Sequence, residues 1–525
     1  MLWLALHLPL LSLEAFCATL PAADTDADTD AGTARPVVLL VEHRVHSANP
    51  AAVACGIRPG MKRATALALA AELLPAEASP ARDAAALQAV AHAALAFTPS
   101  VTLHDTQTVL LEVQASLRLF GGLAALHRRL AAALAPLGHR VQIAAAPTAL
   151  GAALLAQWFP TPSGRSDPAA LVTGPHATDT TVLQALLDAA PVALLGPGRV
   201  HGETLQGMGL HRLSDLRVLP RGGLARRFGA ELLDELDRAL GRQPDLRRWV
   251  LLPARFDSRL ELFARADSSE QVLHGARVLL ARLVAWAQAR HARVGAFTLR
   301  MRHERQRQAM LPATELQVAL AEPSLDPAHL QLLLRERLAR VVLAAPTLEL
   351  QLQCSHLVAG AAPNGELFPT QASEAEGLAR LLERLRARLG DEQVQRLVAV
   401  ADHRPERASR AVPAQGEGVA APRTAAVGSS TAAMGAGALP LHRPVWLLPE
   451  PLPLVERDTL PLLQGRPLQL LSGPERIETG WWDGEPTARD YFIAQAEDNS
   501  LVWVWRARLP EAAGEVHWFL QGRFA

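Results

Sequence analysis

The chain has 525 residues with 52 basic and 52 acidic side chains, and several domains are expected because a single hydrophobic core stops growing at roughly 250–300 residues. Neutral charge excludes a uniformly basic nucleic-acid-binding protein, so any basic surface must be local; Lys62 is the only lysine, and the remaining positive charge is arginine. Three scattered cysteines exclude a disulfide framework or a CxxC zinc site and fit a reducing cytoplasm.

The first 23 residues, MLWLALHLPLLSLEAFCATLPAA, are apolar enough to be weighed as a signal peptide. They have no basic start, His7 and Glu14 interrupt the apolar run, and bulky Phe16 precedes Cys17, where a lipoprotein site needs a small residue. We therefore expect a buried first strand at 2–8 in a cytoplasmic protein, with an exported α/β protein as the alternative. No other apolar run reaches about 18 residues, so no membrane span is expected.

Residues 1–180 alternate between apolar strands and Ala/Leu-rich helices, which predicts an α/β domain with a mixed sheet. The acidic segment DTDADTDAGTARP (24–36) is interpreted as a solvated insertion, since the glycine and glutamate of a calcium loop are misplaced in it. Strands are expected at 36–42, 101–113 and 139–146, and helices from residue 63 and at 82–97, 122–137 and 148–158.

Residues 190–245 consist of short helical stretches separated by glycine turns. LLGPGR (194–199) and GMGLHRLSDL (207–216) resemble the two halves of a helix-hairpin-helix unit, whose glycines let backbone N–H groups approach a phosphate without reading sequence. A plain helical hairpin is the alternative. The candidate DNA contacts here are Gly196, Gly198, Arg199, Gly207 and Gly209.

Residues 251–360 predict a small α+β domain of ferredoxin-like β-α-β-β-α-β order, with two helices on one face of a sheet. In its second strand Thr298, Arg300 and Arg302 share one face. Arg300 and Arg302 are candidate phosphate contacts, and the alternative is a charged face kept in solvent. The expected strands are 258–263, 294–304, 314–322 and 347–358, and the expected helices are 272–292 and 327–343.

The last third of the chain divides into three parts by composition. Residues 361–407 combine an extended APNGELFPTQ segment, an amphipathic helix at about 374–389 and a short second helix before DHRPE (402–406). Residues 408–440 are rich in Ala, Gly, Pro and Ser and are expected to be a disordered linker. Residues 441–525 regain tryptophan and alternating strands, which predicts a small β-rich module.

The residue sets of common enzymes are missing from the sequence. There is no GxSxG, HExxH, GxxxxGK[ST] or strand-linked GxGxxG. Asp105 and Glu112 bracket one strand, but an offset of seven residues puts them on opposite faces and about 23 Å apart. They cannot share a metal ion, and no metal or other cofactor is expected.

The order of four segments in the first half resembles the palm and fingers of the Y-family translesion DNA polymerases. These segments are MLWLALHLP, SANPAAVACGIRPGM, the strand region 102–122 and AAAPTALGAALLA. The hairpin unit resembles the thumb, and the β-α-β-β-α-β region resembles the little finger. DHRPE, RPVWLLPEP and GPERIETGWWDGEPTARDYF resemble the polymerase-like subunits of bacterial mutagenesis cassettes, which extends the match to nearly the whole chain. The resemblance implies a role in DNA damage repair by translesion synthesis, in mutagenesis and in the SOS response.

Active members of this family hold two Mg²⁺ ions with two aspartates in the first strand and an Asp-Glu pair in a later strand. Alignment puts Ala5 and His7 at the first two positions, and Gln107 and Thr108 at the acidic pair. The resemblance therefore implies a degenerate site without Mg²⁺-dependent nucleotidyl transfer.

The triphosphate-binding tyrosine and arginine of the family are also replaced, by Pro50 and Val53. An active polymerase with displaced ligands, which would have to recruit Asp105, is the alternative.

The resemblance also implies partners. PNGELFP lies where the mutagenesis subunits carry a sliding-clamp-binding peptide of QLxLF type, with Asn364, Glu366, Leu367 and Phe368 as the candidate contacts and Gly365 replacing the first leucine. QLL at 469–471 is a poorer alternative. The Trp-rich tail resembles the region that contacts an ImuA-like protein and an error-prone C-family polymerase. We thus expect a non-catalytic adaptor that binds damaged primer-template DNA through its backbone and recruits that polymerase to the clamp.

Overall fold

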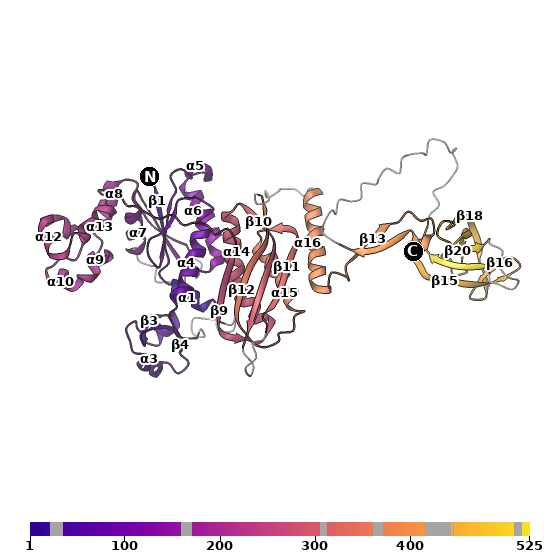
Figure 1. Ribbon diagram of the computed structural model, residues 1–525, viewed down its shortest axis with the longest axis horizontal. Coiled ribbons are helices and arrows are strands. Elements are labelled where there is room, and N and C mark those ends of the chain that lie inside the picture. Colours follow the sequence, from indigo (N-terminus) through magenta and orange to yellow (C-terminus); the bar gives the residue numbers. More distant parts are fainter. Residues whose placement is uncertain are drawn as a thin grey trace. The chain divides into compact units, whose positions relative to one another are not determined.

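The computed structural model describes residues 1–20, 35–158, 171–304, 312–360, 371–414, 443–444, 446–508 and 517–524. The chain forms two compact units, Met1–Arg388 and Leu389–Ala525 (Figure 1). None of the helices in these described segments is long and apolar enough to cross a membrane. The finer domain boundaries proposed above remain predictions.

A five-stranded mixed sheet organises the first unit, in the order β5-β6-β1-β7-β8. The central β1 is antiparallel to β6 and β7, and β7 is parallel to β8, so the expected first strand and mixed sheet are confirmed. Leu4 and Leu6 pack under α4 and α6, whereas Trp3 and Ala5 pack under α7 on the other face (Figure 1). The elements are β1 (Trp3–His7), α1 (Leu11–Cys17), α4 (Pro80–Leu95), β5 (Val101–Leu103), β6 (Thr108–Glu112), α5 (Leu117–Phe120), α6 (Leu123–Leu134), β7 (Val141–Ala146), α7 (Ala149–Trp158) and β8 (Leu171–His176).

The expected strand region 101–113 is a hairpin instead of one strand. β5 and β6 pair antiparallel, with Val101 opposite Leu111. The polar residues between them form the turn, because Asp105 accepts a hydrogen bond from the backbone of Gln107 at 2.8 Å.

A small second sheet, in the order β3-β2-β4, carries its own apolar cluster. The β2–β3 turn places Glu42 and His43 at positive φ. Only the first of its strands was expected from the sequence, since the other two are short and partly polar. The elements are β2 (Val37–Val41), β3 (Arg44–Ala48), α2 (Pro50–Ala54), α3 (Arg63–Leu69) and β4 (Leu74–Glu77).

Short helices follow the five-stranded sheet and share a leucine-rich core with α7. Close packing requires one of their glycines, because a Cβ on Gly198 would lie 2.0 Å from the carbonyl oxygen of Val192. The helices are α8 (Thr180–Asp188), α9 (Gly196–Val200), α10 (Gly202–Gly207), α11 (Leu213–Val218), α12 (Arg221–Phe228) and α13 (Glu231–Ala239).

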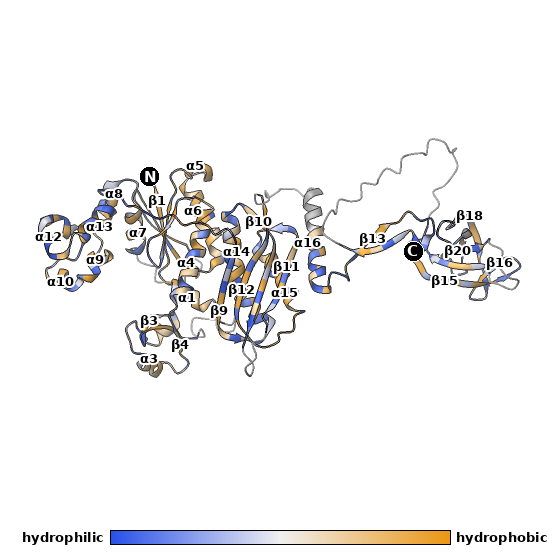
Figure 2. Ribbon diagram, in the orientation of Figure 1, coloured by the Kyte–Doolittle hydropathy of each residue, from blue (hydrophilic) through white to orange (hydrophobic). Residues whose placement is uncertain are grey.

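The β-α-β-β-α-β region has the predicted element order and forms an antiparallel sheet in the order β11-β10-β12-β9. The first strand lies at an edge beside the last, which the order of elements along the sequence does not determine. Hydrophobic and hydrophilic residues alternate along its strands (Figure 2), and Phe297, Leu299 and Met301 are fully buried, as predicted. The elements are β9 (Asp257–Ala266), α14 (Ser269–Ala289), β10 (Ala292–His303), β11 (Thr314–Ser324), α15 (Pro327–Leu338) and β12 (Thr347–Ala359).

The amphipathic helix expected at 374–389 is α16 (Gln371–Leu389). The prediction of a short second helix before DHRPE was wrong. β13 (Gln395–Ala399) stands there and pairs with β14 (Ser409–Pro413), at the start of the predicted linker. The pairing partners lie ten or more residues away, so the local sequence pattern could not reveal them. Residues 415–440 of the linker lie outside the described residues.

The C-terminal unit is β-rich, as predicted. Its strands form a sheet in the order β17-β16-β15-β21-β20-β19-β18. Stacked aromatic pairs lie in its core, with ring centroids 4.2 Å apart for Tyr491 and Trp503 and for Trp505 and Phe519. The strands are β15 (Trp446–Arg457), β16 (Leu460–Leu463), β17 (Arg466–Pro467), β18 (Gln469–Thr479), β19 (Thr487–Gln495), β20 (Leu501–Ala507) and β21 (Trp518–Arg523).

Candidate functional site

The four positions aligned with polymerase carboxylates come together where β1 ends and β6 begins. His7 is the cross-strand partner of Thr108, and Ala5 that of Leu110. The Nδ1 atom of His7 lies 3.0 Å from Oγ1 of Thr108, whose side chain is fully buried. The methyl group of Ala5 packs in the apolar cluster under α7. The neighbouring Gln107 contributes its backbone carbonyl, which accepts a hydrogen bond from the N–H of Leu8 at 2.8 Å.

Two histidines at this end of the sheet are held in the neutral form. Burial lowers the pKa of His7, against the opposing charge of Asp105. Burial, reinforced by the guanidinium of Arg247, also lowers the pKa of His104. Arg247 lies 3.0 Å from Nδ1 of His104 and pairs with Asp245 at 2.5 Å. The site therefore offers neutral imidazoles at neutral pH.

The single acid at the turn, Asp105, already has partners for both oxygens. One accepts from the backbone of Gln107, and the other accepts from Nε2 of Gln157 at 2.9 Å. Within the described residues, no group of three or more His, Cys, Asp or Glu side chains is arranged to hold a metal ion. The hydroxyl of Thr108, the amide of Gln107 and the neutral imidazoles can form hydrogen bonds with one another or with water. Mg²⁺ sites in proteins use carboxylates, which these groups cannot replace.

In the helix-hairpin-helix region, some of the backbone N–H groups that could bind a phosphate already donate to acidic side chains of the same chain. The N–H of Gly196 donates to both carboxylate oxygens of Glu235, at 3.1 and 3.2 Å. At the start of α11, Asp215 accepts from the backbone of His211 and Arg212, both at 2.9 Å. A carboxylate at a helix N-terminus takes the place that an anion would take. Sequence reasoning missed both acids, although Asp215 lies three residues after Arg212, where a capping residue is expected.

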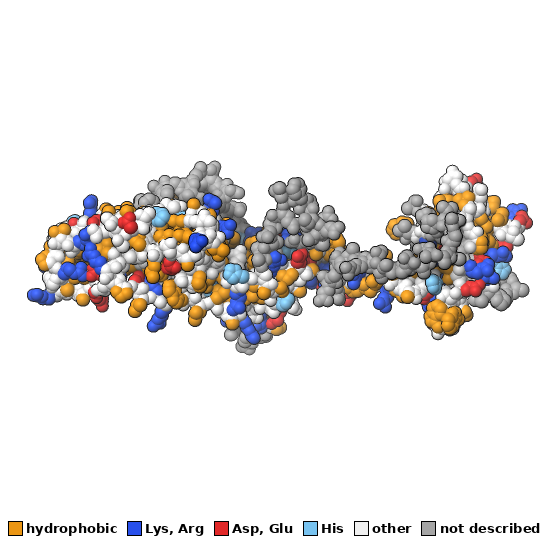
Figure 3. All heavy atoms as spheres, turned by 90° about the horizontal axis from the view of Figure 1, so that it is seen from above, with side chains coloured by type: hydrophobic (Ala, Val, Ile, Leu, Met, Phe, Trp, Pro, Cys, Tyr) orange, Lys and Arg blue, Asp and Glu red, His pale blue; other side chains and the backbone are white. Residues whose placement is uncertain are grey.

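The other candidates of this region remain predictions. Gly209 has φ +79°, and a Cβ on Gly207 would meet only open space. Arg199 is exposed. Lys and Arg side chains gather over α9–α13 on the face seen in Figure 3. The exposed arginines of these helices and the turns between them are Arg199, Arg212, Arg221, Arg226 and Arg227.

The two arginines of β10 lie on the predicted face, but each faces an acid on a neighbouring strand. Arg300 pairs with Glu315 of β11 at 2.9 Å, and Arg302 pairs with Glu349 of β12 at 2.7 Å. The face is therefore a mixed-charge surface, which the sequence of β10 alone could not show. The candidate clamp contacts Asn364, Glu366, Leu367 and Phe368 lie outside the described residues.

The DHRPE and GWWDGEP motifs meet in the C-terminal unit. The buried guanidinium of Arg404 bonds to Asp402 at 2.7 Å, to Asp483 and to the carbonyl oxygen of Glu485 at 3.4 Å. The hydrogen bond from Arg404 lowers the pKa of Asp402 to about 2. Arg407 pairs with Asp483 at 3.3 Å and with Glu485. One motif thus fixes the turn formed by the other.

This turn presents two adjacent tryptophans to solvent. Trp481 is 80% exposed and Trp482 is 54% exposed, with ring centroids 5.4 Å apart. Gly480 begins the turn at φ +81°, and a Cβ there would lie 2.1 Å from the carbonyl oxygen of Glu485. Exposed aromatic side chains on a fixed backbone are typical of protein-binding surfaces. The sequence predicted a Trp-rich binding module but not this tip.

Comparisons with known proteins bear on both units. A model of the impB/mucB/samB family matches residues 22–157. Protein ImuB from two strains of Caulobacter vibrioides is 29% identical over 491 residues, which cover 89% of this chain and the whole of that relative. This chain is ImuB-like.

The likeness to ImuB is not confined to the first unit. The second unit, Leu389–Ala525, is longer than the 11% of the chain left outside the ImuB match, so the match extends into it. Among solved structures, a Dbh ternary complex is 16% identical over 68% of this chain and all of its own, with a TM-score of 0.37. DinB from Sulfolobus solfataricus is 17% identical over 69% of this chain and all of its own, with a TM-score of 0.36.

Proposed function

We propose that this ImuB-like protein is a non-catalytic adaptor in error-prone translesion synthesis. The observation that carries this function is the hydrogen-bonded pair of His7 and Thr108, which stands where active relatives need carboxylates. A neutral pair cannot neutralise a triphosphate or hold two Mg²⁺ ions. The residues at this place support the sheet and leave the chemistry to another polymerase.

The first part of this function is DNA binding through the phosphate backbone. The exposed arginines of α12, Arg226 and Arg227, together with Arg199, have no acid partner in the described part of the chain, in contrast to Arg300 and Arg302. Guanidinium groups of this kind bind phosphates in a salt-dependent manner without reading sequence. We assign the DNA contact of this chain mainly to the short helices α9–α13.

The second part is recruitment of protein partners by the C-terminal unit and by the segment 361–370. The Trp481–Trp482 tip supplies rigid apolar area, and the acids beside it, Asp483 and Glu485, are paired with Arg404 and Arg407. Such a tip favours a partner with an apolar pocket. We assign it to an ImuA-like protein or an error-prone C-family polymerase, and we assign Leu367 and Phe368 to the sliding clamp.

A pull-down with the purified full chain tests these assignments. The Trp481→Ala/Trp482→Ala variant should lose the ImuA-like protein or the C-family polymerase and keep the clamp. Trp446→Ala is the matched control, because Trp446 is a 71% exposed tryptophan of the same unit. Retention of both partners by the double variant would contradict the assignment of the tip.

The clamp is tested in the same assay with Leu367→Ala/Phe368→Ala. This variant should lose the clamp and keep the other partners. Gln469→Ala/Leu471→Ala serves as the control for the alternative peptide at 469–471. Clamp binding that survives the first change and disappears with the second would move the contact to β18.

A further inference from the structure

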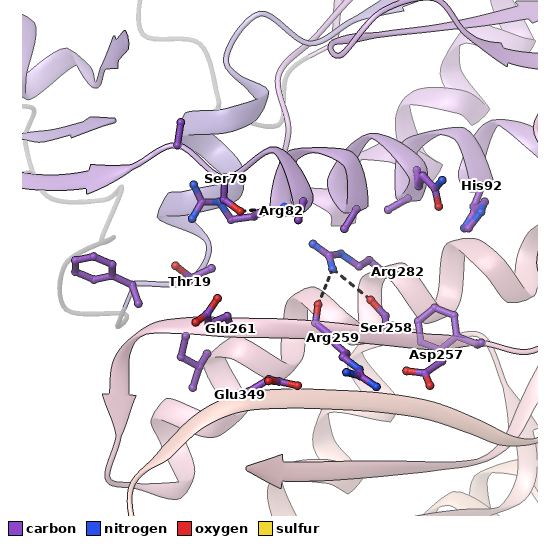
Figure 4. A pocket seen from close by; sticks show the side chains of 18 of the residues that line it. Thr19, Ser79, Arg82, His92, Asp257, Ser258, Arg259, Glu261, Arg282 and Glu349 are labelled. Atoms are coloured by element: carbon purple, nitrogen blue, oxygen red, sulfur yellow. Dashed lines mark hydrogen bonds between the residues drawn. The ribbon is translucent and has the colours of Figure 1, made fainter. Parts of the chain in front are cut away.

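A pocket of about 730 Å³ lies between helix α4 of the five-stranded domain and strand β9 and helix α14 of the β-α-β-β-α-β domain, all within the first unit (Figure 4). It is separate from the end of the central sheet described above. Its volume lies within the range of small-molecule sites, about 300–1,000 Å³. None of the motifs in the sequence pointed to it, because its walls come from segments more than 150 residues apart.

Arg282 of α14 projects between the walls of this pocket (Figure 4). The residue is only 6% exposed. Its Nη1 atom donates to Oγ of Ser258 at 3.2 Å and to the carbonyl oxygen of Arg259 at 3.4 Å. Both acceptors are neutral, and the Nε and Nη2 donors have no protein partner among the described residues.

A buried guanidinium without a carboxylate is costly, because a buried charge is normally paired. None of the described acids forms an ion pair with Arg282, and burial alone lowers its pKa to about 10. An anion bound in the pocket would supply the missing charge. The free edge of the guanidinium carries two donors in the fork geometry that fits a phosphate or carboxylate.

The opposite wall contributes a second cation. Arg82, in the first turn of α4, donates from Nη2 to the carbonyl oxygen of Glu77 at 3.4 Å and lies over the ring of Phe16. Its Nε atom is buried without a hydrogen-bond partner, and it forms no ion pair with a described acid. The N-terminal end of α4, capped by Ser79, lines the same pocket, and helix N-termini favour anions. Arg82 and the start of α4 thus line the same pocket as Arg282.

None of the described acids that line the pocket forms an ion pair with Arg282 or Arg82. Burial lowers the pKa of Arg82, and the charge of Glu261 acts on Arg82 against that effect. Asp257 accepts from the amides of Gln351 and Gln353 at 2.7 and 2.8 Å, and Glu349 is paired with Arg302. The remaining two acids, Glu77 and Glu261, are exposed. Oε1 of Glu349 is buried without a hydrogen-bond partner among the described residues, and the other acidic groups of the pocket have partners or are exposed.

We propose that this pocket binds the phosphate group of a small molecule of nucleotide size, with the Arg282 guanidinium as its anchor and Arg82 on the facing wall. This site does not depend on the adaptor function or on either protein partner. Binding there would also link the two domains that form the walls.

Calorimetric titration of the full chain with inorganic pyrophosphate tests the site. We expect one saturable site in the wild type and affinity at least tenfold weaker in Arg282→Met, which keeps an unbranched side chain and removes the charge. Arg335→Met removes the same charge from an exposed position of α15 that lies in none of the proposed binding sites, and it should bind like the wild type. No saturable binding to the wild type, unchanged binding to Arg282→Met or an equal loss in both variants would overturn the proposal.

Three further measurements test the site independently. Modification of the wild type with phenylglyoxal, read by mass spectrometry, should be slowed by pyrophosphate at Arg282 and Arg82 but not at Arg335. Equal modification with and without pyrophosphate would contradict the site even if Arg282→Met fails to fold. Citrate should compete weakly, and a short DNA duplex should bind wild type and Arg282→Met alike. If Arg282→Met no longer binds the DNA duplex but still binds pyrophosphate, the pocket is a contact for the DNA backbone, and the proposal of a small-molecule site is wrong.

Discussion

His7 and Thr108 face each other across β1 and β6, with Nδ1 of the imidazole 3.0 Å from Oγ1 of the hydroxyl. The resemblance to the Y-family polymerases predicts that these positions correspond to metal-binding acids of the active members. Here the side chains of His7 and Thr108 form a hydrogen bond with each other, and burial lowers the pKa of the imidazole. A hydrogen bond between two uncharged side chains thus links β1 and β6 at this end of the sheet.

Replacement of Thr108 by valine should destabilise this end of the sheet. The change keeps the shape of the buried side chain but leaves Nδ1 of His7 without its partner, which costs about 1 kcal/mol of unfolding free energy. Urea denaturation followed by circular dichroism measures the shift. Thr106→Val, in the exposed turn next to it, should change stability by less than about 0.5 kcal/mol; equal effects would contradict a stabilising role for the hydrogen bond.

The ion pairs that hold the turn with Trp481 and Trp482 should contribute less to the stability of the second unit at low pH. Asp402 has its pKa depressed from 3.8 to about 2, chiefly by Arg404. A depressed carboxyl pKa gives stability that is complete above the ordinary pKa and is lost as the pH falls through the depressed one. Thermal melting of the wild type and of Asp402→Asn should therefore differ at pH 5 and converge near pH 2. A difference that persists at pH 2 would contradict this role of the carboxylate.

Two glycines of the same turn provide a matched pair of substitutions. Gly480 and Gly484 both have φ +81°, so alanine is strained at either position by roughly 1–2 kcal/mol. Only at Gly480 does the added Cβ meet the carbonyl oxygen of Glu485, at 2.1 Å. Gly480→Ala should thus lower the melting temperature of the second unit more than Gly484→Ala and alter the tryptophan emission. Equal shifts would show that the close contact is relieved without cost.

DNA affinity should depend on α12 more than on β10. Arg226→Ala/Arg227→Ala removes two exposed cations and should reduce the slope of log affinity against log salt by about 2. Arg300→Ala/Arg302→Ala should have a smaller effect, because Glu315 and Glu349 already pair with these residues. Fluorescence anisotropy with a primer-template duplex at several salt concentrations measures both. The reverse order of effects would assign the DNA to the face of β10.

The sequence predicted what depends on local pattern. The apolar run of β1, the alternation of Phe297, Leu299 and Met301 and the order of the β-α-β-β-α-β elements were all readable, because burial and strand period are local properties. The assignment of Ala5, His7, Gln107 and Thr108 to carboxylate positions rests on family resemblance instead of such a pattern, and it stays a prediction.

What the sequence missed depends on contacts between distant segments. Three such contacts join an acid to a group 15 or more residues away in the sequence. They are Glu235 with the amide of Gly196, Glu315 with Arg300 and Asp483 with Arg404. The Arg282 pocket likewise needs two domains to form. Charge in the sequence of one element therefore overestimates the charge that the folded surface presents.

Primer extension is the most direct test of the central claim. Full-length protein mixed with a primer-template duplex, all four deoxynucleotides and either Mg²⁺ or Mn²⁺ should yield no extended product, whereas an active Y-family polymerase in parallel should extend the primer. The account predicts the same null result for wild type and Asp105→Asn. Extension by the wild type that disappears in Asp105→Asn would contradict it and identify a polymerase with displaced ligands.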